Sequence, residues 1–273
     1  MLTKLEFTNV RGDVLSLPIS DYSNGYLVSD IEGLGPVKAT LTSASMAQLD
    51  GAQPQSSRRD VRNITFKIEL KPNYSDTTVD SLRTALYAYL LPKAVVGIKI
   101  YRDGSSWGLT TGTVESFDNT LFTQKPEMDG SIICYDPDFY GPSVVSVSGS
   151  TVADTTTQAI NYAGTSDAGV IFTLNVNRSI AGFNLYNIKP DGTTQTFLYE
   201  GALVNGDVVV VTSIPRQKSI IKTTSGTPSS VLAGVDSSSA WISLGSGINE
   251  FRAAVSGAAI PYTIQYTPKY GAF

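Results

Sequence analysis

The chain has 273 residues, enough for one large domain or two ordinary ones, and its net charge of −4 leaves neither half with the strongly positive surface that binds nucleic acid. It contains no histidine, which excludes Ser-His-Asp and Cys-His nucleophile systems and zinc sites that use histidine. A single cysteine, Cys134, excludes an intrachain disulfide, and its apolar neighbours predict a small core residue.

Other classes of site and segment are missing from the sequence as well. Residues 1–13 alternate and carry charge, so we expect a strand there and not a signal peptide. No apolar run approaches the roughly 20 residues of a membrane span, so we expect synthesis in the cytoplasm and no membrane insertion. Phosphate-binding loops, dinucleotide fingerprints and cysteine clusters are absent too. We therefore expect no catalytic residue, no cofactor and no metal.

The first third of the chain predicts strands over 4–10, 14–19 and 26–31. Two further runs, 37–42 and 63–70, alternate apolar and polar residues, and each predicts a half-buried strand.

Between these two runs lies a polar segment that has no apolar face, with Gly51, Pro54 and a Gln-Ser tract. Long connections of this kind belong to functional arms or disordered loops. We interpret residues 44–62 as an arm that lies on another molecule. Its tip is expected at Gln53, Pro54 and Gln55, and its anchors are expected at Arg58, Arg59 and Arg62. The three arginines could contact nucleic acid, but on an acidic protein they are better suited to a partner's carboxylates.

One helix is predicted over 78–91, because apolar residues recur there at helical spacing. Thr77 and Asp80 resemble a capping box, and Pro92 ends the helix. The apolar stripe favours a helix that covers one face of a sheet over a binding helix. Strands follow at 95–101, 112–117 and 131–135, with turns at 103–106 and 128–130.

The segment 136–142 holds two prolines and a glycine, which predicts a fixed junction between domains 1–141 and 142–273. About ten short strand candidates at regular spacing follow it, which is typical of a β-sandwich or barrel. The run 208–211 predicts a strand buried on both faces, or an edge strand covered in an assembly. Trp241 is a candidate glycan contact, although aromatic residues on a sandwich are more often part of the core.

Carboxylate pairs at i and i+2 occur twice, at Asp30 with Glu32 and at Asp136 with Asp138. On a strand such a pair shares one face, so glycosidase-type acid–base chemistry is geometrically conceivable. Each pair flanks a Gly or Pro turn, however, where Asp caps the local backbone. We favour the structural interpretation.

Several short motifs in residues 1–141 are informative through their order. They are 30–34 (DIEGL), 36–39 (PVKA), Asp50-Gly51, the arm ending in 62–65 (RNIT), Leu82-Arg83 and Leu86-Tyr87 with Pro92-Lys93, 112–116 (GTVES), Phe122 and 134–139 (CYDPDF). In this order they resemble the distal tail protein family of long-tailed, non-contractile phages, the Dit-type component of the baseplate hub. Residues 142–273 are similar to the family only in their series of short strands at regular spacing. Residues 241–251 in particular are similar to the late strands of the family's galectin-like or carbohydrate-module-like sandwich.

The resemblance implies a structural protein of the virion, synthesised in the host cytoplasm and located at the tail tip. It implies a mainly β fold: an N-terminal α+β, sandwich-like domain with one helix and an extended arm, and a C-terminal all-β sandwich. The N-terminal domains would form a hexameric ring in which each arm belts its neighbour, and the ring would join the tail tube protein to hub or fibre proteins. DNA would pass through the channel without specific binding. The alternative is a carbohydrate-binding adhesin whose C-terminal sandwich recognises a host surface glycan.

Overall fold

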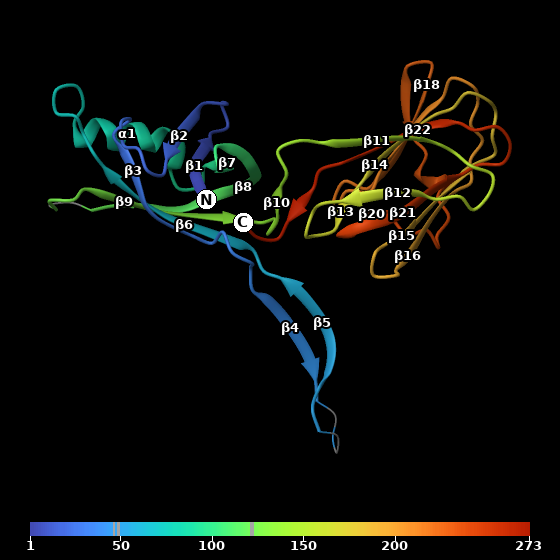
Figure 1. Ribbon diagram of the computed structural model, residues 1–273, viewed down its shortest axis with the longest axis horizontal. Coiled ribbons are helices and arrows are strands. Elements are labelled where there is room, and N and C mark those ends of the chain that lie inside the picture. The colour runs from blue at the N-terminus through green and yellow to red at the C-terminus, as the bar shows by residue number, and fades with distance from the viewer. Residues whose placement is uncertain (46, 48–49, 121–122) are drawn as a thin grey trace. The chain divides into compact units, whose positions relative to one another are not determined.

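The computed structural model describes residues 1–45, 47, 50–120 and 123–273 (Figure 1). Phe122 and three positions of the expected arm lie outside the described residues. The fold is mainly β, as predicted. The chain divides into two compact units, Met1–Pro142 with Tyr270–Phe273, and Ser143–Lys269. The last four residues therefore belong to the first unit, whereas the sequence prediction placed them in the second.

The first unit contains one large antiparallel sheet in the order β2-β1-β7-β8-β9-β6-β3. Its strands are β1 (Leu2–Thr8), β2 (Val14–Pro18), β3 (Tyr26–Glu32), β6 (Arg62–Leu70), β7 (Val95–Arg102), β8 (Ser105–Asn119) and β9 (Glu127–Cys134). The short strand β10 (Phe139–Tyr140) pairs with β8 through Tyr140 and Leu109. A separate two-stranded sheet consists of β4 (Ala39–Ala44) and β5 (Gln53–Arg59).

The large sheet curls around its core. In the sheet order β1 and β6 are separated by three strands, which is about 19 Å along a flat sheet. The rings of Phe7 on β1 and Phe66 on β6 nevertheless lie 5.1 Å apart, centroid to centroid. Strands from both ends of the sheet contribute buried apolar side chains to its inner face. Together with those of the helix, these side chains form one hydrophobic cluster.

The helix α1 (Val79–Leu90) lies over one face of this sheet (Figure 1). Its buried residues, Leu82, Leu86 and Leu90, are the predicted apolar stripe. The capping box differs from the prediction by one position. Thr78 is the N-cap and exchanges hydrogen bonds with Ser81, because Thr78 has the extended backbone that an N-cap requires.

Two predictions of local structure in the first unit are wrong. Residues 128–130 do not turn but continue β9, where Gly130 leaves space for the ring of Phe66. Residues 37–42 do not form a half-buried strand: β4 leaves the large sheet, and Leu41 is 75% exposed. The turn predicted at 103–106 is present, and Asp103 and Gly104 both have positive φ, as a tight hairpin turn requires.

The second unit is a β-sandwich. One sheet has the order β11-β22-β14-β17-β18-β19 and the other β12-β21-β15-β16. The strands are β11 (Val145–Ser150), β12 (Gln158–Tyr162), β14 (Ile171–Asn175), β15 (Phe183–Ile188), β16 (Thr194–Tyr199), β17 (Val208–Thr212), β18 (Ser219–Thr224), β19 (Thr227–Ser230), β21 (Gly247–Ala254) and β22 (Pro261–Tyr266). A small third sheet joins β13 (Ala168–Gly169) to β20 (Ser243–Leu244), and a single 3₁₀ turn, η1, spans Leu232–Gly234. The short strand β23 (Lys269–Tyr270) follows β22 in the chain but pairs with β10 in the large sheet.

Aromatic residues join the two sheets of the sandwich. Phe172 on β14 contacts both Phe251 on β21 and Phe183 on β15, with ring centroids 6.1 and 5.9 Å apart. The strand β17 is neither buried on both faces nor at an edge, which corrects the prediction for 208–211. It lies between β14 and β18, and every second residue is buried. Within the described part of the chain, no helix is both long and apolar enough to cross a membrane.

Candidate assembly site: the arm and its base

The arm, defined here as residues 39–59, is a β-hairpin that extends away from the large sheet (Figure 1). The polar segment 53–59, expected to be part of a long connection between two strands, forms β5 and pairs with β4 from Ala39↔Arg59 to Ala44↔Gln53. Every residue of β5 is exposed, and so is every residue of β4 except Ala44. An isolated two-stranded hairpin is at best marginally stable in water, so a hairpin with both faces exposed is suited to being covered by another molecule.

The pairing places different chemistry on the two faces of the arm. Thr40 and Arg58 are directly opposite each other on one face, whereas Leu41 lies opposite Ser57 on the other. A register shift between Thr42 and Ser43 leaves Gln55 as a bulge. Gln53 and Pro54 begin β5, at the end of the hairpin remote from the sheet, and their role as the contacting tip stays a prediction.

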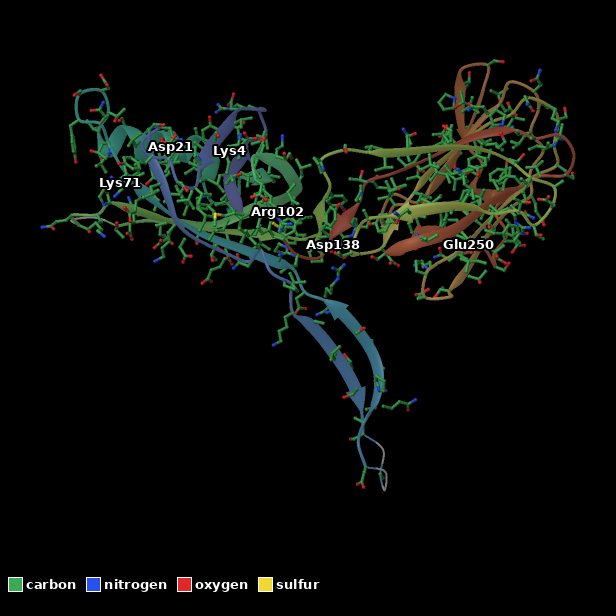
Figure 2. All side chains as sticks on the ribbon, in the orientation of Figure 1. Lys4, Asp21, Lys71, Arg102, Asp138 and Glu250 are labelled. Atoms are coloured by element: carbon green, nitrogen blue, oxygen red, sulfur yellow. The ribbon has the colours of Figure 1, made fainter. Side chains whose placement is uncertain are left out.

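Arg58 and Arg59 are neighbours in sequence but differ in their contacts. Within the residues described, Arg58 is exposed and has no hydrogen-bond or ion-pair partner. Arg59 binds Asp138 with both ends of its guanidinium, Nη1 to Oδ1 at 2.5 Å and Nη2 to Oδ2 at 2.9 Å. Figure 2 shows Asp138 where the arm joins the first unit. Asp138 is nearly buried, with 4% of its side chain exposed, and hydrogen bonding to it raises the pKa of Arg59.

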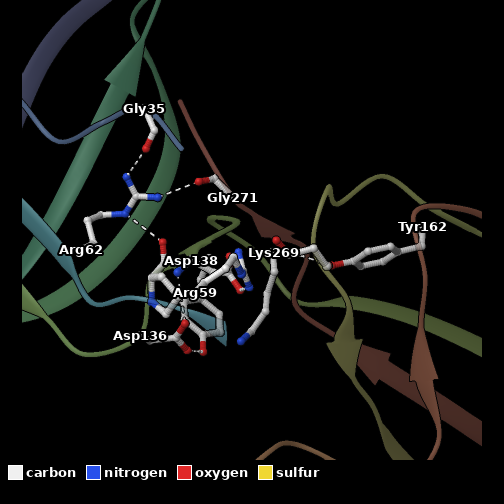
Figure 3. Close-up of polar contacts among 11 residues, drawn as sticks. Gly35, Arg59, Arg62, Asp136, Asp138, Tyr162, Lys269 and Gly271 are labelled. Carbon is white, nitrogen blue, oxygen red and sulfur yellow. Dashed lines mark hydrogen bonds and ion pairs between the residues drawn. The ribbon is translucent and has the colours of Figure 1, made fainter. Parts of the chain in front are cut away.

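Arg62 is fully buried, so its side chain lies inside its own subunit and not in an exposed interface. Its guanidinium donates to four backbone carbonyls, and three of these contacts are visible in Figure 3. The acceptors are the carbonyl oxygens of Pro137 (2.8 Å), Gly33 (2.5 Å), Gly35 (2.7 Å) and Gly271 (2.7 Å). The guanidinium also stacks on the ring of Phe139, 4.2 Å from the centroid. Burial lowers the pKa of Arg62 from its ordinary value, but an arginine stays charged at any physiological pH.

These contacts fix both ends of the arm. The incoming end is held at Gly33 and Gly35, and the outgoing end at Arg59 and Arg62. Between them, Asp60 donates its N–H to the carbonyl of Lys38 at 2.9 Å and accepts a hydrogen bond from the Thr40 hydroxyl. The base of the arm is therefore fixed by charged hydrogen bonds, while the rest of the hairpin is exposed.

Sequence reasoning identified the three arginines but missed their acceptors. Asp138 was considered only with Asp136, as a pair of backbone caps, and Asp136 does accept the Asp138 N–H. The carbonyls around Arg62 have no sequence signature, because every residue has one. The only available signal was an arginine at the first position of a strongly alternating strand, where it falls on the buried face.

The other candidate sites lie elsewhere. Asp30 and Glu32 are exposed on the edge strand β3. Cys134 is fully buried, as predicted. Trp241 is half-buried, with its ring 5.2 Å from that of Phe197 in the core of the second unit. Glycan contact at Trp241 stays a prediction.

The comparisons with known proteins agree with this fold. Residues 163–270 match the family described as the siphovirus-type tail component, C-terminal domain. The Dit protein (gp 19.1) of phage SPP1, described as a paradigm of the hub adsorption apparatus in phages that infect Gram-positive bacteria, has a similar fold. Its TM-score is 0.69 and its identity 15%, over 97% of this chain and 98% of that one. A chain from the structure of the phage P2 baseplate, in the activated conformation of that baseplate with Ca, aligns with this chain over the full length of both at 9% identity. Its TM-score of 0.49 is too low to support an argument.

The resemblance to Dit-type tail proteins is thus confirmed, by sequence over most of the second unit and by fold over nearly the whole chain. The family match falls in the second unit, whereas the sequence motifs that suggested the family lie in the first. None of the proteins of curated function matches the sequence.

Proposed function

We propose that this chain is a structural component of a phage tail tip, in which the first units of several copies form a closed ring and each arm covers the next subunit. Two findings support a place in a phage tail: the fold shared with SPP1 Dit, and the match of the second unit to a tail-component family. The observation that carries the proposal is the arm itself, exposed along both strands yet fixed at its base by Arg59 and Arg62.

An arm that binds a different surface on the next copy makes a heterologous contact, and such contacts close into rings when the rotation between copies allows it. We propose a hexameric ring, as the resemblance implies, between the tail tube protein and hub or fibre proteins in the virion. In this arrangement Arg58, Gln53, Pro54 and Gln55 contact the neighbouring copy. Arg59 and Arg62 act within their own subunit and position the arm. The proposal assigns no reaction, cofactor or metal to the chain.

Removing the arm tests this function. In the armless variant, residues 39–59 are replaced by Asn-Gly, so that Lys38 and Asp60, which already share a hydrogen bond, close a tight hairpin. Light scattering of the purified wild type should give the mass of a ring, and the armless variant should give smaller species, because the contact that joins the copies is gone. A variant that keeps the wild-type mass contradicts the belt, and a wild type that stays monomeric at high concentration contradicts self-assembly of the ring.

A point variant on the arm refines the test. Leu41→Asp places a charge on an exposed side chain of β4 and should lower the oligomer mass without lowering the melting temperature. Leu232→Asp is the matched control, because Leu232 is also an exposed leucine, 50% accessible, but lies in the second unit. Equal effects of the two substitutions would show that the added charge acts without regard to the arm.

A further inference from the structure

The segment Tyr270–Phe273 contacts the base of the arm, although it follows the whole second unit in the chain. Two backbone groups of this segment reach both ends of the arm. The Gly271 carbonyl accepts a hydrogen bond from Nη2 of Arg62 at 2.7 Å, on the outgoing side. The Phe273 N–H donates to the carbonyl of Leu34 at 2.9 Å, on the incoming side.

Aromatic packing holds this segment in place. The ring of Phe273 lies 4.9 Å from that of Trp107 on β8, in an edge-to-face arrangement, and the Arg102 guanidinium stacks on it at 4.2 Å. The ring of Tyr270 lies 5.4 Å from that of Trp107, centroid to centroid. Trp107 in turn contacts Phe139, which lies beneath the Arg62 guanidinium. A continuous set of contacts therefore joins the segment to Arg62.

The loop Gly33–Pro36 depends on these contacts for its position. Its described interactions with the rest of the unit include Arg62 at Gly33 and Gly35 and Phe273 at Leu34. Loss of the segment would remove the bond to Leu34 and leave one N–H of a buried guanidinium without its acceptor. An unpaired buried charged donor is unfavourable, so Arg62 would shift and its hold on Gly33 and Gly35 would weaken.

We propose that Tyr270–Phe273 is a latch that fixes the direction of the arm, and that the arm is competent to bind a neighbouring copy only when the latch is docked. The hairpin makes few contacts of its own, so its direction is set at its base. Because the latch comes after the second unit in the chain, the arm becomes fixed only once the second unit has been synthesised. This inference rests on the proposed function for its consequence in assembly but not for the docking of the arm.

The direction of the arm can be measured directly. Spin labels at Ser43→Cys on the arm and Ser131→Cys on β9 report the distance between arm and sheet by pulsed electron paramagnetic resonance, with labelled chains diluted in unlabelled ones. Cys134 is fully buried and should stay unlabelled. Phe273→Ala should broaden the distance distribution, because it removes the ring that holds the latch on Trp107. Tyr74→Ala is the matched control, since it removes an exposed aromatic ring of the same unit and should leave the distribution narrow.

The association between copies and the melting temperature are measured as well, and they separate the possible results. Where the latched state is populated only a tenth of the time, the apparent dissociation constant between copies should rise about tenfold. Broadening without any change in oligomer mass would support the latch and overturn the belt function. A distribution as narrow as that of the wild type would overturn the latch. If Phe273→Ala lowers the melting temperature strongly, Phe273→Leu keeps an apolar side chain there and should give intermediate broadening in a folded chain.

Discussion

Arg62 shows how a single charged residue can organise the base of an exposed element. It is fully buried, and the groups that accept its hydrogen bonds are backbone carbonyls from three segments, 33–35, 137 and 271. Buried charges are tolerated when hydrogen bonds replace those lost to water, and four of the five guanidinium N–H groups donate here. Through these hydrogen bonds Arg62 fixes the position of the base of the arm.

Replacing Arg62 should destabilise the first unit strongly. Arg62→Met keeps much of the side-chain length but removes the guanidinium donor from four backbone carbonyls, those of the exposed Gly35 and of three half-buried residues, so the unfolding free energy should fall by about 2–3 kcal/mol. Urea unfolding followed by Trp107 fluorescence, in a Trp241→Phe background, reports on the first unit alone. Arg58→Met is the control, and as an exposed change it should stay within about 0.5 kcal/mol. A loss no larger than the control's would contradict the structural role of Arg62.

At the scale of the element, the arm depends on a backbone conformation at its entrance. Gly33 has a φ of +84°, and a Cβ there would collide with the carbonyl oxygen of Asn63 on β6. Gly35, two residues later, has open space around its Cα and is not in the left-handed region. The entrance therefore requires glycine at one of these positions and tolerates a side chain at the other.

The two glycines form a matched pair for mutagenesis. Gly33→Ala should lower the unfolding free energy of the first unit by about 1–3 kcal/mol, because it combines a strained φ with a clash against backbone. Gly35→Ala should have an effect of less than about 1 kcal/mol in either direction. The same Trp107 unfolding assay measures both. Similar losses for the two variants would show that the entrance is not constrained as the structure indicates.

At the scale of the whole molecule, the two units differ in whether they are formed by one continuous segment of the sequence. The second unit is continuous and has its own core, whereas the first includes residues that follow the second in sequence. A continuous unit with a closed apolar core meets the conditions for folding alone. The first unit, cut at Pro142, loses the Gly271 carbonyl that Arg62 binds.

Residues 143–269, expressed alone, should therefore fold. A single cooperative unfolding transition, followed by Trp241 fluorescence, and well-dispersed amide resonances would show this. Residues 1–142 alone should unfold at lower denaturant concentration than the first unit of the full chain, because the latch is missing. A second unit that is unfolded in isolation would contradict the division into independent cores.

Much of the fold was predictable because its signals are local. Alternation located β3, β6, β7 and most strands of the second unit, and a stripe of leucines located α1. Each of these patterns depends on residues a few positions apart, so no knowledge of the chain's path was needed. The same reasoning failed for 37–42, where alternation is present but the strand pairs with β5 away from the core.

The sequence by itself determined that the protein is mainly β, that its first half carries an exposed polar arm near residues 44–62, and that arginines cluster at the end of that arm. Only the tertiary structure decided which arginine is exposed, which binds Asp138 and which is enclosed by carbonyls. It also decided that Tyr270–Phe273 belongs to the first unit. The physical reason is that backbone carbonyls are the same at every position. Which of them surround a guanidinium depends on where distant segments of the chain meet, and periodicity within one segment carries no information about that.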